Sequence, residues 1–141
     1  MPLIRKKIVI VESIWGSQRI LAEIISQFDS SLQVDNLSAG LFMAKYLSYA
    51  IQPQLPSLII MGYAPPLLDT PAILELMKSK EIFNGITKVV LLDFGLGQFE
   101  VDWIAAGATM VFQKPARPSE LKAIIRNILT EAKMYQNKGA S

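Results

Sequence analysis

Short runs of apolar residues recur along this chain, and longer stretches with apolar residues at helical spacing lie between them. A short, continuous run rich in β-branched residues is typical of a parallel strand that helices cover on both faces. The runs predict strands at Ile8–Val11, Leu32–Leu37, Leu58–Met61, Lys88–Leu92 and Met110–Phe112. Strands that alternate with helices in this way predict βαβ units, a parallel sheet and right-handed crossovers.

The stretches between the strands have apolar residues three or four positions apart, which predicts helices with one buried face. The expected helices are Ser17–Phe28, Ala39–Ile51, Pro71 to about Lys80, Phe99–Ala106 and a last helix that begins at Pro118. Ser17 and Thr70 are the expected caps of the first and third helices. Ile20 and Leu76 belong to the stripes expected to face the core, whereas Ala39–Ile51 has more apolar side chains than one face can bury.

Length and composition are those of one globular domain. The chain has 141 residues, of which 51% are hydrophobic and 18% charged, and no apolar run approaches the roughly 20 residues of a membrane span. We therefore expect a single domain over residues 1–141, with its core at about 6–132, a polar tail at 133–141 and no membrane partner. Met1 to Lys7 is not followed by a signal-type cleavage region, so a cytoplasmic location is expected.

The chain contains neither cysteine nor histidine. This composition excludes disulfides, a thiolate nucleophile, an imidazole base and the usual transition-metal sites. We expect no enzymatic activity, no cofactor and no bound metal. The net charge of +2 is small and scattered, so no nucleic-acid partner is expected either, and Arg5-Lys6-Lys7 is interpreted as a solvated strand entry.

The segment Ala106–Leu121 gathers several signals around one lysine. Gly107 suits the left-handed position after a helix end, and a short apolar strand, expected to be buried, leads to Lys114. Pro115 keeps Lys114 out of helical backbone, and Pro118 suits the first position of a helix. The carboxyl edge of an open α/β sheet is where ligands bind, which makes Lys114 a candidate site residue.

Ala106-Gly107-Ala108, the Lys114-Pro115 pair and the Pro-Ser-Glu-Leu helix start resemble the last strand and helix of the receiver domains of two-component response regulators. The resemblance extends over about Lys6 to Ala132. It implies a doubly wound, flavodoxin-like α/β fold with strand order 2-1-3-4-5, in which several strand ends share one carboxyl edge. It also implies a cis peptide bond before Pro115.

The chain departs from this family at most positions that carry its chemistry. In the family an acidic pair after the first strand holds Mg²⁺, an aspartate after the third strand accepts a phosphoryl group, the fourth strand ends in Ser or Thr, and an aromatic switch residue lies before the lysine. The matching residues here are, in that order, Glu12-Ser13, Gly62, Asp93 and Val111, and only Lys114 is kept. A glycine has no carboxylate to accept a phosphoryl group, so phosphorylation is not expected.

These departures lead to a hypothesis about function. We expect Lys114 to pair with Asp93, Glu12 or both, because a partly buried ammonium needs a nearby negative charge. The alternative is a weakly bound cation held by Glu12 and Asp93.

The chain is interpreted as a phosphorylation-independent pseudo-receiver that binds a sensor kinase, a regulator, an output protein or a second copy of itself. The candidate partner surface is Phe99, Trp103, Ile104 and Val111, with at least one aromatic or apolar side chain of the short helix packed in the core. The alternative function is a sensor that binds an anion, a quinone or a nucleotide in the altered pocket.

Overall fold

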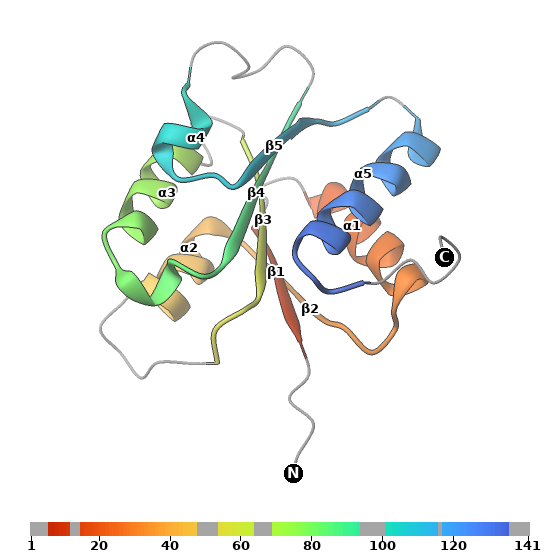
Figure 1. Ribbon diagram of the computed structural model, residues 1–141, viewed down its shortest axis with the longest axis horizontal. Coiled ribbons are helices and arrows are strands. Elements are labelled where there is room, and N and C mark those ends of the chain that lie inside the picture. Colours follow the sequence, from red (N-terminus) through yellow and green to blue (C-terminus); the bar gives the residue numbers. More distant parts are fainter. Residues whose placement is uncertain are drawn as a thin grey trace.

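The computed structural model describes residues 6–11, 15–47, 54–63, 69–93, 101–115 and 117–135. These residues form a five-stranded parallel sheet with helices on both faces (Figure 1). The strands are β1 Lys7–Val11, β2 Gln33–Leu37, β3 Leu58–Gly62, β4 Thr87–Leu92 and β5 Met110–Gln113. Their order is β2-β1-β3-β4-β5, which confirms the doubly wound, flavodoxin-like arrangement that the resemblance implies.

Two helical layers cover the sheet, one on each face (Figure 1). One layer consists of α1 Trp15–Phe28 and α5 Pro118–Glu131. The other consists of α2 Ala39–Phe42, the π-helical turn η1 Met43–Leu47, α3 Thr70–Lys78, the 3₁₀ turn η2 Glu81–Phe83 and α4 Trp103–Ala106. Because side chains alternate along a strand, β1 sends Val9 and Val11 into the core under α3 and Ile8 and Ile10 into the core under α1 and α5. No helix in the described part of the chain combines the length and apolar character that crossing a membrane requires.

The strand register brings three candidate site residues to one edge of the sheet. Gly62 at the end of β3 pairs with Leu91 of β4, and Leu92 pairs with Gln113 of β5. Asp93 and Lys114 each follow one of these paired residues, so they leave the sheet side by side at its carboxyl edge. This is the placement that the predicted strand order implies.

Three predicted helix starts are wrong. The first helix begins at Trp15, so Ser17 lies within α1 instead of capping it. In α3 the cap is Asp69, whose carboxylate accepts a hydrogen bond from the backbone N–H of Ala72 at 3.3 Å. Thr70, one residue later, is already helical and fully buried. The short fourth helix begins at Trp103 behind the cap Asp102; residues 94–100, which include Phe99, lie outside the described residues.

Several burial predictions are also wrong. Ile20 on α1 and Leu76 on α3 are exposed, at 51% and 42% of their full surface, although both fit the apolar stripes. Strand β5 is only partly buried because it lies at the edge of the sheet. Lys7, interpreted as solvated, is buried.

The predicted polar tail begins later than expected. After α5, Lys133 takes a left-handed conformation with φ 59°, and the N–H of Met134 donates to the carbonyl of Leu129 at 2.8 Å. This is the hydrogen bond of a Schellman motif, which closes the helix and turns the chain back. Met134 is buried, and the ring of Tyr135 packs edge-on against Phe28 at 5.1 Å. The folded core therefore reaches residue 135, not 132; residues 136–141 lie outside the described residues.

Candidate functional site

An ion pair joins the ends of β4 and β5 at the carboxyl edge. The Nζ atom of Lys114 lies 3.3 Å from Oδ1 of Asp93, with the lysine side chain 18% and the aspartate side chain 36% exposed. The backbone holds the two residues in place, because the N–H of Lys114 donates to the carbonyl of Leu92 at 2.7 Å and so continues the ladder between the strands. The predicted pairing of Lys114 with Asp93 is confirmed. Glu12 and Ser13 lie outside the described residues, so a second partner at Glu12 stays a prediction.

Beside this pair, β3 ends in a glycine that is tied to α3. Gly62 is buried, and its carbonyl accepts a hydrogen bond from the hydroxyl of Thr70. This hydrogen bond fixes the start of α3 against the end of β3. The sequence predicts a different role for the Thr70 hydroxyl, which is to cap the helix. A threonine before a proline at a helix start was the available signal, but its partner eight residues earlier could not be inferred from it.

The described part of this edge does not fit a Mg²⁺ site. Mg²⁺ prefers a near-octahedral set of oxygen ligands with one or two carboxylates. The carboxylate of Asp93 is already paired with the ammonium of Lys114 at 3.3 Å, and this positive charge disfavours a metal ion beside it. Among the residues that the structure describes, no three acidic side chains come together to hold a metal ion.

The candidate partner surface divides into a buried and an exposed part. Trp103 is only 4% exposed and meets the ring of Tyr63 edge-on, with the ring centroids 5.0 Å apart. The prediction that Trp103 belongs to a partner surface is therefore wrong, and the expectation that at least one side chain of this short helix packs in the core is confirmed. Val111 is partly buried against the same core, whereas Ile104, the next residue of α4, is 62% exposed. The cis geometry proposed for Pro115 stays a prediction.

A second ionic cluster, which the sequence analysis missed, lies between β1, β2 and η1. Nζ of Lys7 is 3.1 Å from Oδ2 of Asp35, and Nζ of Lys45 is 3.6 Å from the same atom. Both ammonium groups lie over the ring of Tyr46, at 5.4 and 5.5 Å from its centroid. Burial alone would lower the pKa of Lys7, but Tyr46 and Asp35 outweigh it and raise that pKa above its ordinary value of 10.5. Burial opposes the charge of Asp35 as well, and the neighbouring Lys7 ammonium nevertheless lowers the pKa of this carboxyl.

Two further polar groups are buried on the side of the sheet that faces α3. The hydroxyl of Tyr46 is buried and has no hydrogen-bond partner among the described residues. Lys88 at the start of β4 is also buried, and its ammonium donates to the carbonyls of Phe83 at 2.7 Å and Ile86 at 3.1 Å. Burial lowers the pKa of Lys88 from its ordinary value of 10.5. The sequence contains a signal for the charged members of these clusters, because Asp35 and Lys88 are charged residues inside predicted strands.

Comparison with known proteins gives a curated relative and many similar structures. The response regulator Rre1 of Synechocystis sp. is 27% identical over 90 residues, which is 64% of this chain. The chain thus matches 39% of the length of that relative. No protein-family model matches the chain.

The similar structures cover nearly the whole chain. The phosphorylated cyanobacterial phytochrome response regulator RcpA superposes with a TM-score of 0.73 and 22% identity over 98% of both chains. The receiver domain of a signal transduction histidine kinase from Syntrophus aciditrophicus gives a TM-score of 0.68 and 21% identity, over 94% of this chain and 96% of that domain. With its strand order and its carboxyl-edge lysine, the chain has the CheY-like fold of response-regulator receiver domains.

Proposed function

We propose that this chain is a phosphorylation-independent receiver module of two-component signalling, which binds a protein partner and has no catalytic activity of its own. The observation that carries the proposal is the ion pair between Lys114 and Asp93 beside Gly62. Such a role implies a cytoplasmic location and a partner such as a sensor kinase, a regulator or an output protein.

The charges at the carboxyl edge support this proposal. In the receiver pattern that the chain resembles, the lysine binds a phosphoryl group carried by the third strand. Here the third strand ends in Gly62, and a carboxylate from the fourth strand lies 3.3 Å from the lysine. A negative charge that is built into the chain meets the same electrostatic need as a transferred one, because an ammonium in a partly buried site is costly without a counter-charge.

The partner surface that we propose is centred on Ile104. This isoleucine is exposed on α4, next to the buried Trp103 that anchors the helix. The ammonium of Lys78 on α3 donates to the carbonyl of Ala105 at 2.9 Å and ties the two helices together. An exposed apolar side chain on a fixed element can bind a partner without a large loss of conformational entropy.

Incubation with acetyl phosphate and Mg²⁺, followed by intact mass spectrometry, tests the chemical part of the proposal. We expect no phosphoryl adduct on this chain, while RcpA, whose phosphorylated form is known, provides the positive control in the same reaction. Stoichiometric, hydroxylamine-sensitive phosphorylation would contradict the proposal. Asp69 and Glu12 are the residues to examine first in that case.

Capture of partners from the native cell tests the binding part. The matched variants are Ile104→Glu on α4 and Ile20→Glu on α1, since both replace an exposed isoleucine but on opposite layers. We expect Ile104→Glu to lose the partner and Ile20→Glu to keep it. A thermal-shift screen with anions, quinones and nucleotides covers the sensor alternative; a ligand that stabilises the wild type but not Lys114→Met would replace the adaptor proposal.

A further inference from the structure

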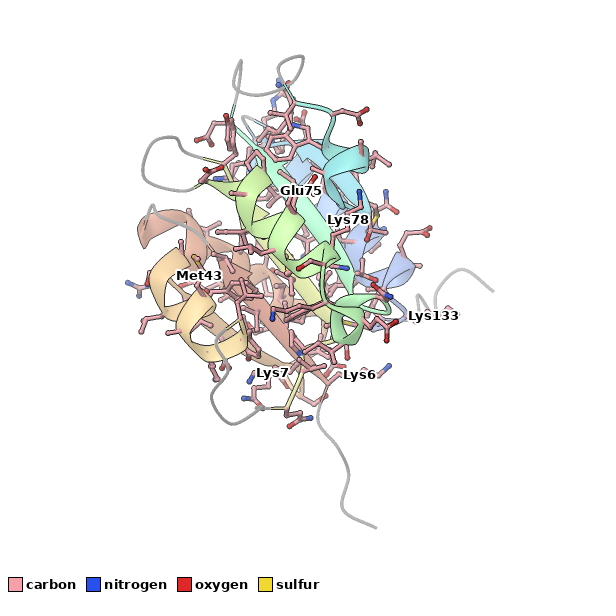
Figure 2. All side chains as sticks on the ribbon, turned by 90° about the vertical axis from the view of Figure 1, so that its left-hand side faces the viewer. Lys6, Lys7, Met43, Glu75, Lys78 and Lys133 are labelled. Carbon is pink, nitrogen blue, oxygen red and sulfur yellow. The ribbon has the colours of Figure 1, made fainter. Side chains whose placement is uncertain are left out.

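The turn between η2 and β4 contains an Asn84-Gly85 pair. Figure 2 shows the α3 layer toward the viewer, and the chain passes there from α3 through η2 into this turn. Both residues of the pair are exposed. Asparagine followed by glycine is the pair in which the backbone nitrogen most readily attacks the side-chain amide, because glycine has no Cβ atom to shield that nitrogen. The pair is therefore a candidate for covalent modification.

The peptide group that joins Asn84 to Gly85 can rotate without breaking a hydrogen bond. The turn is held on one side by the N–H of Asn84, which donates to the carbonyl of Glu81 at 3.0 Å. On the other side the N–H of Ile86 donates to the carbonyl of Phe83 at 3.1 Å. Within the described part of the chain, neither the Asn84 carbonyl nor the Gly85 N–H has a hydrogen-bond partner. Asn84 has a ψ of −35°, and rotation of this angle brings the Gly85 nitrogen toward the side-chain amide.

We propose that Asn84 is a site of spontaneous deamidation in the folded chain. The Gly85 nitrogen gives up its proton and forms a C–N bond to the side-chain amide carbon of Asn84. The C–N bond of the amide breaks, and its nitrogen takes up a proton and leaves as ammonia. Water then opens the resulting succinimide ring at one of its two carbonyl groups, which gives aspartate or isoaspartate at position 84. Water is the only co-reactant, because no atom is oxidised or reduced in either step.

The conformation of Gly85 provides a matched control. A Cβ atom built on Gly85 meets no atom of the surrounding structure within 4 Å, and among the described glycines only Gly107 has a positive φ. Alanine therefore fits the native turn, while its methyl group shields the nitrogen that attacks. Gly85→Ala is expected to keep the fold and to prevent the reaction.

The modification would add a negative charge to the turn that holds the buried Lys88. The Lys88 ammonium donates to the carbonyls of Phe83 and Ile86, which lie on either side of the Asn84-Gly85 pair. Burial lowers the pKa of Lys88, and no carboxylate of the described residues offsets this effect. Both products have a carboxylate where Asn84 has a neutral amide. This carboxylate would attract the ammonium and favour its charged form.

Incubation of the full, folded chain at mildly alkaline pH, followed by peptide mass spectrometry, tests the proposal. We expect the peptide that contains Asn84 to gain the mass difference between an amide and a carboxyl group, in separate aspartate and isoaspartate forms. Peptides that contain Asn36 or Asn127, which precede bulkier residues, should stay unchanged, and so should Gly85→Ala. Thermal melts establish that this variant is folded. The reaction does not depend on the partner binding proposed above, so each proposal can fail alone.

A wild-type chain that stays unmodified at Asn84 would overturn the proposal. A parallel incubation in urea then shows whether the folded turn prevents the attack, in which case the unfolded chain alone reacts. Modification of Gly85→Ala at the rate of the wild type would overturn the proposed attack by the Gly85 nitrogen.

Asn84→Asp tests the effect of the new charge, because every molecule then has the side chain of the aspartate product. Thermal melts of the wild type, Asn84→Asp, Lys88→Met and the double variant form a double-mutant cycle. We expect Asn84→Asp to shift the melting temperature upward more in the wild type than in Lys88→Met. Equal shifts in the two backgrounds would overturn the link between the modification and Lys88.

Discussion

The ion pair between Lys114 and Asp93 predicts that these two residues are energetically coupled. Lys114→Met leaves the Asp93 carboxylate without this ammonium, and Asp93→Asn leaves the ammonium without this charge. Each single variant should therefore lose stability, because a partly buried charge has lost its counter-charge. The double variant removes both charges, so it should be more stable than the sum of the two single losses implies.

The expected magnitude follows from the separation and the exposure of the two groups. At 3.3 Å the attraction would be about 5 kcal/mol for an effective dielectric constant of about 20, before any desolvation cost is subtracted. The exposures of 18% and 36% place the pair between exposed pairs, which contribute about 0.2–1 kcal/mol, and buried pairs, whose breakage costs about 3–5 kcal/mol. Because Asp93 is the more exposed of the two residues, solvent screening brings the expected coupling energy closer to the range of exposed pairs. We expect a coupling energy of about 1 kcal/mol.

Urea melts of the wild type, the two single variants and the double variant measure this coupling. A control cycle combines Lys114→Met with Glu23→Gln, because Glu23 lies on α1 and is paired with Arg19. The control pair should be additive within about 0.3–0.5 kcal/mol. If Lys114→Met and Asp93→Asn are additive within the same margin, the pair contributes no coupling, and the electrostatic basis of the proposed function fails.

Two further predictions concern buried polar groups on the α3 side of the sheet. Tyr46→Phe removes a buried hydroxyl that has no hydrogen-bond partner within normal distance among the described residues, so it should raise the free energy of unfolding by about 1 kcal/mol, and it should also lower the pKa of Lys7, which Tyr46 helps to raise; a loss of stability in urea melts would show that the hydroxyl is satisfied. Lys88 has a lowered pKa, so the unfolded chain binds its proton more tightly than the folded chain between that lowered value and 10.5. The wild type should therefore gain stability relative to Lys88→Met as the pH rises through this window, and a difference that is independent of pH would contradict the burial of a charged lysine.

The parallel α/β architecture could be predicted because it depends on strong, local patterns. Short β-branched runs separated by helical segments restrict the topology to a few arrangements. Once strands four and five are neighbours, the residues that follow them, Asp93 and Lys114, must lie side by side. The resemblance to receiver domains added the order itself, which the periodicity alone does not determine.

The wrong predictions of helix caps and burial concern residues whose environment depends on contacts with other elements of the fold. Thr70 and Asp69 both carry an oxygen suited to capping, and the buried carbonyl of Gly62 determines which of them points inward. The sequence predicts a solvated Lys7 because the counter-charge that lets it be buried, Asp35, lies on another strand. For Leu76, periodicity gives the direction of a buried face but not its width, and so it cannot separate a core residue from one at the margin of the helix.

The contacts at the carboxyl edge of the sheet affect how the proposed receiver module would be controlled. A phosphorylation switch needs two states, and a signal changes their populations only if it binds one state more tightly than the other. Here the carboxylate that pairs with Lys114 is part of the chain, and Trp103 packs firmly against Tyr63. A fixed charge cannot be added or removed by a kinase, so it offers no differential interaction at this edge. Control would then act through association, in which the concentrations of the chain and of its partner decide the outcome.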